Sequence, residues 1–233
     1  MMQTLDREVL DHLSQWLAAG EQPWLCTIVK TTGSSPRPVG SLVAISESGL
    51  QVGSVSGGCV EEELLENIRN GKSPGSTPEL LEYGVTAEEN ERLGLPCGGR
   101  IQLLLQRLGD EDKDWVDELL RALSQRQCME RTLELATATT RLTPAPHFRS
   151  LALSGDTLRH CFGPRMRMLL VGAGELARRL AELGQAMDYE VVITDPRTTK
   201  IAPWEGPDVE LIQGMPDNVI RQHASDRHSV IIT

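Results

Sequence analysis

The sequence has few aromatic residues and little basic charge. Phe, Trp and Tyr make up 3% of its 233 residues, so the core is built from aliphatic side chains and a large planar ligand finds few rings to stack on. Lys and Arg number 23 against 33 Asp and Glu, a net charge of −10. Nucleic-acid phosphates and anionic lipid both require clustered basic residues. The charge balance therefore argues against nucleic acid and membrane surfaces as partners.

The sequence also lacks a long apolar run and a cysteine cluster. No stretch approaches the roughly 18–20 apolar residues of a membrane span, and the first ten residues lack the apolar core of a signal peptide, so we expect a cytoplasmic protein. The cysteines are odd in number and form no C-x-x-C pair, which predicts neither a disulfide framework nor a structural zinc site. They are Cys26, Cys59, Cys97, Cys128 and Cys161.

Hydrophobic periodicity changes near Gly163. Before it, the pattern predicts helices over 5–19, 60–68 and 113–125, and strands over 24–31, 41–45, 50–55, 79–85, 100–106 and 131–139, with a hairpin partner at 151–153. After it, strands over 168–171, 191–194, 209–212 and 230–233 enclose helices over 176–187 and 217–223, which predicts a parallel sheet. We therefore predict an α/β protein with an N-terminal α+β domain over residues 1–162 and a short, Rossmann-like half-fold over residues 163–233.

A G-x-G-x-x-A pattern, GAGELA, begins at Gly172 directly after an apolar strand. Gly172 and Gly174 permit a tight turn and close backbone approach to a pyrophosphate, and Asp195 ends the next strand, where a carboxylate accepts hydrogen bonds from a ribose. The pattern indicates NAD(P) or another nucleotide. The alternative is a turn kept for packing alone, which Glu175 favours because its carboxylate repels a diphosphate at the start of the helix.

The stretch Gly53–Glu61, GSVSGGCVE, precedes a predicted helix. Small residues allow backbone N–H groups to point outward, and the helix dipole favours an anion there, a thiolate included. Gly57, Gly58, Cys59 and Glu61 are therefore candidate cofactor-binding residues, with Cys59 as a thiolate ligand or a sulfur carrier. The alternative is a plain loop in which glycine supplies positive φ and the cysteine fills a small pocket.

Two further stretches carry similar signals. Cys97 is followed by Gly98 and Gly99 in the sequence GLPCGG, which repeats the pairing of one cysteine with two glycines. Arg37 lies between two prolines in the sequence GSSPRPVG, where the stiffened loop holds a guanidinium toward an oxyanion or a phosphate. The alternative for Arg37 is a solvated side chain in an ordinary turn.

Taken together and in this order, the stretches GSSPRPVG, GSVSGGCVE, GLPCGG and VGAG with a later DPR resemble the XdhC/CoxI family of accessory proteins. The resemblance implies a maturation factor for molybdenum hydroxylases such as xanthine dehydrogenase, aldehyde oxidase or carbon monoxide dehydrogenase. It implies a chaperone that binds molybdenum cofactor (molybdopterin), protects it while a cysteine desulfurase installs the sulfido ligand, and passes it to the apoenzyme. On the family pattern, Cys59, Cys97 and the four flanking glycines contact the cofactor, and Arg37 pairs with its phosphate.

Three functions remain open from the residues. The first is a cofactor-binding chaperone rather than a turnover enzyme. The second is an NAD(P)- or FAD-dependent oxidoreductase using Gly172, Gly174 and Asp195, although no acid or base for hydride transfer accompanies these residues. The third is a protein-binding scaffold with a vestigial nucleotide fold. The outer strand over 230–233 leaves a sheet edge unpaired, so we also expect a homodimer.

Overall fold

The computed structural model describes residues 4–33, 35–72, 75, 77–92, 99–224 and 226–233. The chain packs into two compact units, one over Met2–Gly163 and one over Pro164–Thr233. Each is described by itself. That residues 1–162 and 163–233 are independent domains stays a prediction. None of the described helices combines the length and apolar character needed to cross a membrane.

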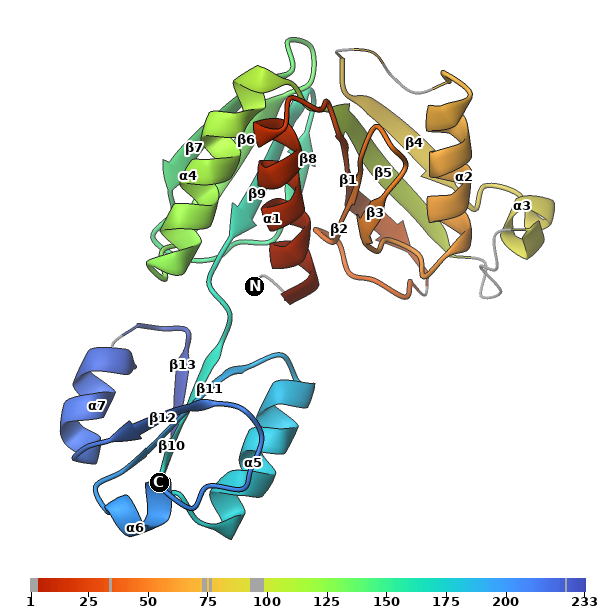
Figure 1. The fold of residues 1–233 in the computed structure, drawn as a ribbon. Coiled ribbons are helices and arrows are strands. Elements are labelled where there is room, and N and C mark those ends of the chain that lie inside the picture. The colour runs from red at the N-terminus through yellow and green to blue at the C-terminus, as the bar shows by residue number, and fades with distance from the viewer. Residues whose placement is uncertain (1–3, 34, 73–74, 76, 93–98, 225) are drawn as a thin grey trace. The chain divides into compact units, whose positions relative to one another are not determined.

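A five-stranded antiparallel sheet organises one half of the first unit (Figure 1). Its strands follow the order β3-β2-β1-β5-β4, with bounds β1 Trp24–Thr32, β2 Leu42–Ile45, β3 Gln51–Gly53, β4 Glu79–Tyr83 and β5 Arg100–Arg107. Helix α2 (Cys59–Arg69) covers one face, where Val60 and Leu64 pack on Ile28 and Ile101 with none of the four more than 1% exposed. A short helix, α3 (Ala87–Arg92), follows β4.

The other half of this unit pairs two helices with a second antiparallel sheet. Helices α1 (Thr4–Ala18) and α4 (Lys113–Ser124) share one core, in which Leu10, Leu13, Val116 and Leu119 are fully buried. A 3₁₀ turn, η1 (Asp110–Asp112), leads into α4. The sheet has the order β7-β6-β9-β8, with bounds β6 Met129–Glu134, β7 Thr139–Pro144, β8 Ala152–Ser154 and β9 Thr157–Phe162.

The predicted strand over 131–139 is wrong in its extent. The chain turns at residues 135–138, where Ala138 adopts φ of +55°, and β6 pairs with β7 across this turn. Alanine carries no turn signal, so the hydrophobic pattern runs through the break unmarked. The segment near Leu153 was expected to pair with the strand over 131–139. It pairs instead with β9, a strand that the sequence pattern did not predict.

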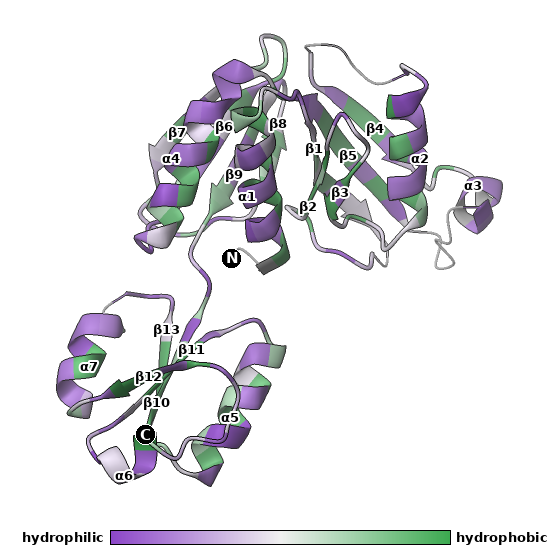
Figure 2. Ribbon diagram, in the orientation of Figure 1, coloured by the Kyte–Doolittle hydropathy of each residue, from purple (hydrophilic) through white to green (hydrophobic). Residues whose placement is uncertain are grey.

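The second unit is a four-stranded parallel sheet with the order β12-β11-β10-β13. Its elements are β10 Arg167–Val171, α5 Glu175–Ala186, β11 Glu190–Asp195, α6 Thr198–Ile201, β12 Glu210–Gln213, α7 Pro216–His223 and β13 Ser229–Ile232. Figure 2 shows hydrophobic residues along β10, whose three central residues, Met168, Leu169 and Leu170, are buried. A Cβ at Gly184 of α5 would lie 2.9 Å from Val191, so this glycine lets the helix approach the sheet closely. The parallel sheet confirms the α/β class.

Candidate functional site

The carboxylate of Glu61 organises the loop that precedes α2. Oε1 accepts hydrogen bonds from the backbone N–H groups of Val55 at 2.8 Å, Ser56 at 2.9 Å and Gly57 at 3.2 Å. Oε2 accepts one from Gly58 at 3.1 Å, and the hydroxyls of both loop serines also donate to this carboxylate. Glu61 is the third residue of α2, so its side chain reaches back over the helix start as in a capping box.

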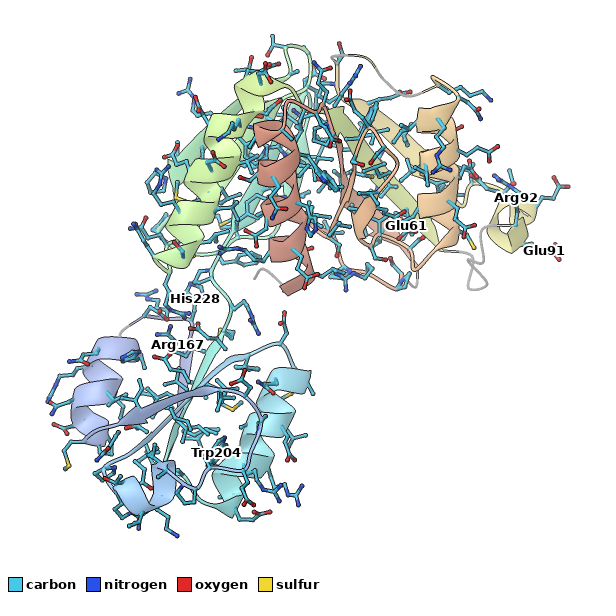
Figure 3. The ribbon with its side chains drawn as sticks, viewed as in Figure 1. Glu61, Glu91, Arg92, Arg167, Trp204 and His228 are labelled. Carbon is cyan, nitrogen blue, oxygen red and sulfur yellow. The ribbon has the colours of Figure 1, made fainter. Side chains whose placement is uncertain are left out.

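This arrangement reverses the expected direction of the loop amides. Glu61 is 1% exposed and lies at the start of α2 (Figure 3). We predicted that it would face a ligand, but its carboxylate is itself the anion that the loop N–H groups bind. Burial raises the pKa of Glu61, but hydrogen bonds from Ser56 and Val55 outweigh it and lower the pKa to about 2. The carboxylate is therefore charged at neutral pH and holds the loop in one shape.

Gly57, Gly58 and Cys59 form the outer side of the same loop. Gly57 has φ of +95° and Gly58 has φ of +147°, which only glycine adopts without strain. Within the part of the chain that the structure describes, a Cβ at either position would meet no atom within 4 Å, so no described side chain covers these two residues. Cys59 is the first residue of α2, and its thiol is exposed and free. The loop thus presents an accessible sulfur beside a backbone that none of the described side chains covers.

The strand pairing brings the three predicted stretches of this unit to one end of the five-stranded sheet. Thr27 pairs with Leu42 and Thr32 with Arg100, so the loop after β1 and the start of β5 share that end. Val43 pairs with Gly53, which places the Cys59 loop there as well. The loops after β1 and β3 lie at this end in Figure 1. We call it the loop end of the sheet.

Arg37 and Gly99 belong to the loop end, whereas Cys97 and Gly98 lie outside the described residues. Arg37 is half-buried, and its Nε and Nη2 atoms are shielded from solvent without a hydrogen-bond partner among the described residues. Shielded guanidinium nitrogens are costly to leave unpaired, so an acceptor ligand would stabilise this conformation. Gly99 is buried and directly precedes β5.

Asp195 of the second unit is buried and bonded within the chain. It is 0% exposed and accepts hydrogen bonds from the backbone N–H of Ala173 at 3.0 Å and of Arg197 at 2.9 Å. The Arg197 guanidinium donates to both carboxylate oxygens at 2.9 Å and holds the pKa of Asp195 well below its usual range. The predicted ribose acceptor therefore fixes the turn after β10 and presents Arg197 to solvent.

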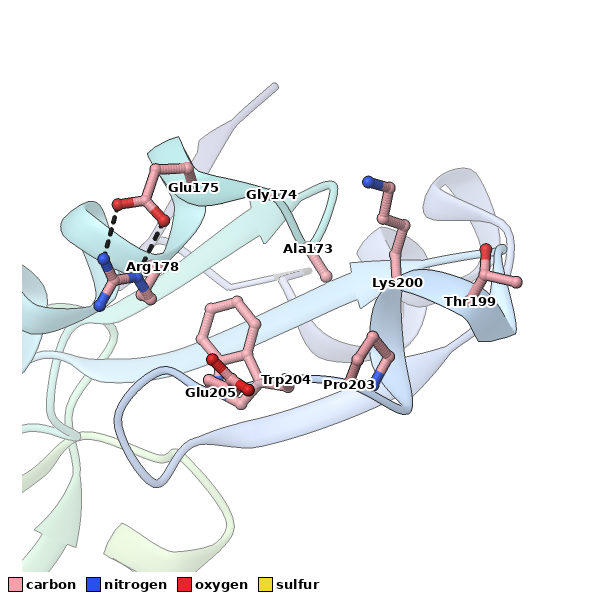
Figure 4. Close-up of a pocket in the computed structure, with 9 residues that line it drawn as sticks. All are labelled: Ala173, Gly174, Glu175, Arg178, Thr199, Lys200, Pro203, Trp204 and Glu205. Carbon is pink, nitrogen blue, oxygen red and sulfur yellow. Dashed lines mark hydrogen bonds and ion pairs between the residues drawn. The ribbon is translucent and has the colours of Figure 1, made fainter.

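A cavity of about 390 Å³ opens beside this turn (Figure 4). Gly174 and Glu175 line it together with Lys200 and Trp204, which the sequence pattern did not single out because their approach depends on how α6 follows β11. The carboxylate of Glu175, expected to repel a diphosphate, pairs with Arg178 at 2.6 Å and with Arg179 at 3.2 Å. Gly172 has φ of +97°, so the turn requires glycine there.

The fold and the loop end define a two-unit α/β protein with an accessible cysteine in a glycine loop. Residues 16–84 match the XdhC and CoxI family, which confirms the resemblance predicted from the sequence. The match includes the Arg37 and Cys59 stretches.

Two relatives and one solved structure extend the likeness over most of the chain. The molybdenum cofactor insertion chaperone PaoD of Escherichia coli K12 is 28% identical over 193 residues, covering 81% of this chain and 58% of the relative. A probable xanthine dehydrogenase subunit of Bacillus subtilis 168 is 23% identical over 239 residues, covering 91% of this chain and 71% of the relative. The crystal structure of a xanthine dehydrogenase from Bacillus halodurans has a TM-score of 0.73 at 21% identity, covering 97% of this chain and 73% of that chain, and shows the shared fold.

Proposed function

We propose that this chain is an accessory protein that binds molybdenum cofactor at the loop end and supports its sulfuration and insertion into a molybdenum hydroxylase. The observation that carries the proposal is the pairing of an exposed Cys59 thiol with an open Gly57-Gly58 backbone. The PaoD chaperone is named for inserting this cofactor, and the chain aligns with 58% of its length.

The residues at the loop end fit the chemistry of this cofactor. Its metal centre and dithiolene favour soft sulfur neighbours, and Cys59 offers such a group. Its phosphate needs donors, and Arg37 has two shielded nitrogens for which the described part of the chain offers no acceptor. Gly57 and Gly58 permit close approach of the cofactor to the backbone, and the Glu61 carboxylate holds both residues in place by accepting their N–H groups. When bound, the cofactor supplies the molybdenum and the sulfur-accepting site, and the chain supplies a holding surface.

Sulfuration and insertion of the cofactor require two protein partners. A molybdenum hydroxylase apoenzyme would receive the cofactor, and a cysteine desulfurase would supply the sulfur. Both follow from the proposed handling of the cofactor. The second relative is named for xanthine dehydrogenase, which supports a hydroxylase client.

A homodimer is part of the same proposal. Three apolar side chains along α5 and at its C-terminal end are strongly exposed, Leu176 at 72%, Leu183 at 58% and Met187 at 59%. Their spacing of seven and four residues places them on one helix face. A second copy would cover this stripe, and light scattering of the wild type and of Leu183→Glu tests it. A monomeric wild type across the micromolar range removes the homodimer and leaves the cofactor proposal untouched.

The second unit is proposed to be a Rossmann-type half. Counting its strands in chain order gives 3-2-1-4, the order of the first four strands in that fold. Its cavity and its glycine turn support binding of a nucleotide, with NAD(P) or FAD as the ligands of the competing oxidoreductase proposal. The hydrogen bonds that already occupy Asp195 argue against a free ribose acceptor there.

One binding experiment separates the two proposals. The full chain is titrated in a calorimeter with isolated molybdenum cofactor and, separately, with NAD, NADP and FAD. We expect cofactor binding that weakens in Cys59→Ala and Cys97→Ala but not in Cys128→Ala, which changes a partly buried cysteine directly before β6. Binding that neither Cys59 nor Cys97 affects refutes the thiol roles. Binding of a dinucleotide alone overturns the chaperone proposal.

A further inference from the structure

Two basic side chains lie on neighbouring strands at the loop end. Lys30 of β1 and Arg100 of β5 are both exposed. Lys30 pairs in register with Gln102, and Arg100 pairs with Thr32. Cross-strand partners and residues two apart share a face, so all four side chains project from one side of the sheet. Neither cation has an ion-pair partner among the described residues.

The two cations are close enough to share one anion. Residues related diagonally across an antiparallel pair lie about 7–8 Å apart, and long side chains converge across that distance. Two like charges at this spacing repel each other, and an anion between them relieves the repulsion. Carboxylates are abundant, with 33 in a chain of net charge −10, yet none pairs with either cation in the part of the chain described.

A cavity of about 120 Å³ adjoins both cations. A cavity of this size admits a group of a few heavy atoms. Thr32 adds a hydroxyl to the lining, and Glu82 adds one carboxylate, which accepts a hydrogen bond from Gln102 Nε2 at 3.1 Å. The lining therefore has two cations against one carboxylate, and its size and charge suit a phosphate.

The cavity is joined to the predicted cofactor loops by the chain itself. Thr32 is followed directly by the loop that carries Arg37, and Arg100 is preceded directly by Gly99. We propose that Lys30, Thr32 and Arg100 form an anion subsite that supplies donors, in addition to those of Arg37, to the phosphate or pyrophosphate end of the ligand held at the loop end. The identity of that ligand rests on the proposed function. The expectation that the subsite binds a phosphate group rests only on its charge and its lining.

The test compares charge removal at the subsite with equal charge removal elsewhere. Lys30→Gln, Arg100→Gln and the double variant are titrated with isolated molybdenum cofactor and with inorganic pyrophosphate. The control is Arg141→Gln with Arg159→Gln, two exposed strand arginines that flank Thr132 in the other sheet of the same unit. Thermal melting checks that every variant is folded, and Arg100→Lys restores the charge.

We expect each single substitution to weaken both ligands about tenfold, the size of one charge-assisted hydrogen bond, while the control pair stays within about twofold of the wild type. Equal losses in the control and the subsite variants refute the subsite, because overall charge then explains them. Cofactor binding that the double variant retains in full also refutes the subsite and leaves the proposed function standing. Pyrophosphate binding that depends on these residues without any cofactor binding keeps the subsite and overturns the proposed function. A wild type that binds neither ligand overturns both.

Discussion

Oε1 of Glu61 accepts a hydrogen bond from the backbone N–H of Val55 at 2.8 Å. The bond joins a residue within α2 to the loop six positions earlier, and the neighbouring N–H groups follow the same pattern. The loop that carries Cys59 is thus shaped from inside by a buried charge. None of the described side chains covers its outer surface over Gly57 and Gly58.

Glu61→Gln should destabilise the first unit. The amide keeps only one acceptor oxygen and turns an NH₂ group toward several backbone donors, which then lose their partner. Buried donors left unsatisfied cost about 2–4 kcal/mol in total. Chemical denaturation measures the loss. The matched control is Glu62→Gln, an exposed neighbour on the same helix, for which we expect less than about 0.5 kcal/mol. Equal effects of the two substitutions would contradict the assigned role.

The stability that Glu61 contributes should depend on pH in a defined direction. Its pKa is about 2 in the folded chain against an ordinary value of 4.5. Between these values the unfolded chain binds the proton more tightly, so stability is present in full above about pH 4.5 and is lost as the pH falls toward 2. The difference corresponds to on the order of 3 kcal/mol. Denaturation of the wild type and Glu61→Gln at several pH values should show the gap between them closing over this window, and a constant gap counts against the shift.

The sequence predicts where the site residues lie along the chain better than it predicts what their polar atoms bind. It places Cys59 at a helix start and Asp195 at a strand end, and the structure agrees with both positions. The partners depend on loop conformation, so the inward turn of Glu61 escaped prediction, although the spacing of three residues from Gly58 is the signal of a capping interaction. The placement of Lys30 diagonally across from Arg100 depends on strand register, which no local sequence pattern sets.

Alanine at Gly57 or Gly58 should disturb the Cys59 loop even though there is space for a methyl group. Both residues have positive φ, where an L side chain costs about 1–2 kcal/mol. We expect lower thermal stability and weaker binding of isolated molybdenum cofactor in either variant. Gly174→Ala is the control, since Gly174 has φ of −106° and equally open surroundings, and it should melt close to the wild type. A Gly57→Ala variant as stable as Gly174→Ala would show that the loop tolerates another backbone conformation.

Asp195→Asn should destabilise the second unit much more than the loss of an exposed ion pair. The buried carboxylate holds the Ala173 turn and the Arg197 backbone together, and the amide cannot accept from all of these donors. A buried backbone donor left without its acceptor costs about 1–3 kcal/mol, whereas the Arg197 guanidinium is 63% exposed and stays solvated. Asp217→Asn breaks the exposed pair with Arg221, whose side chains are more than half exposed, and should cost less than about 1 kcal/mol. Hydrogen exchange of the β10 and β11 amides measures the stability of this unit. We expect faster exchange of these amides in Asp195→Asn and unchanged exchange in Asp217→Asn. Similar exchange in both variants would mean that the turn after β10 does not depend on the buried carboxylate.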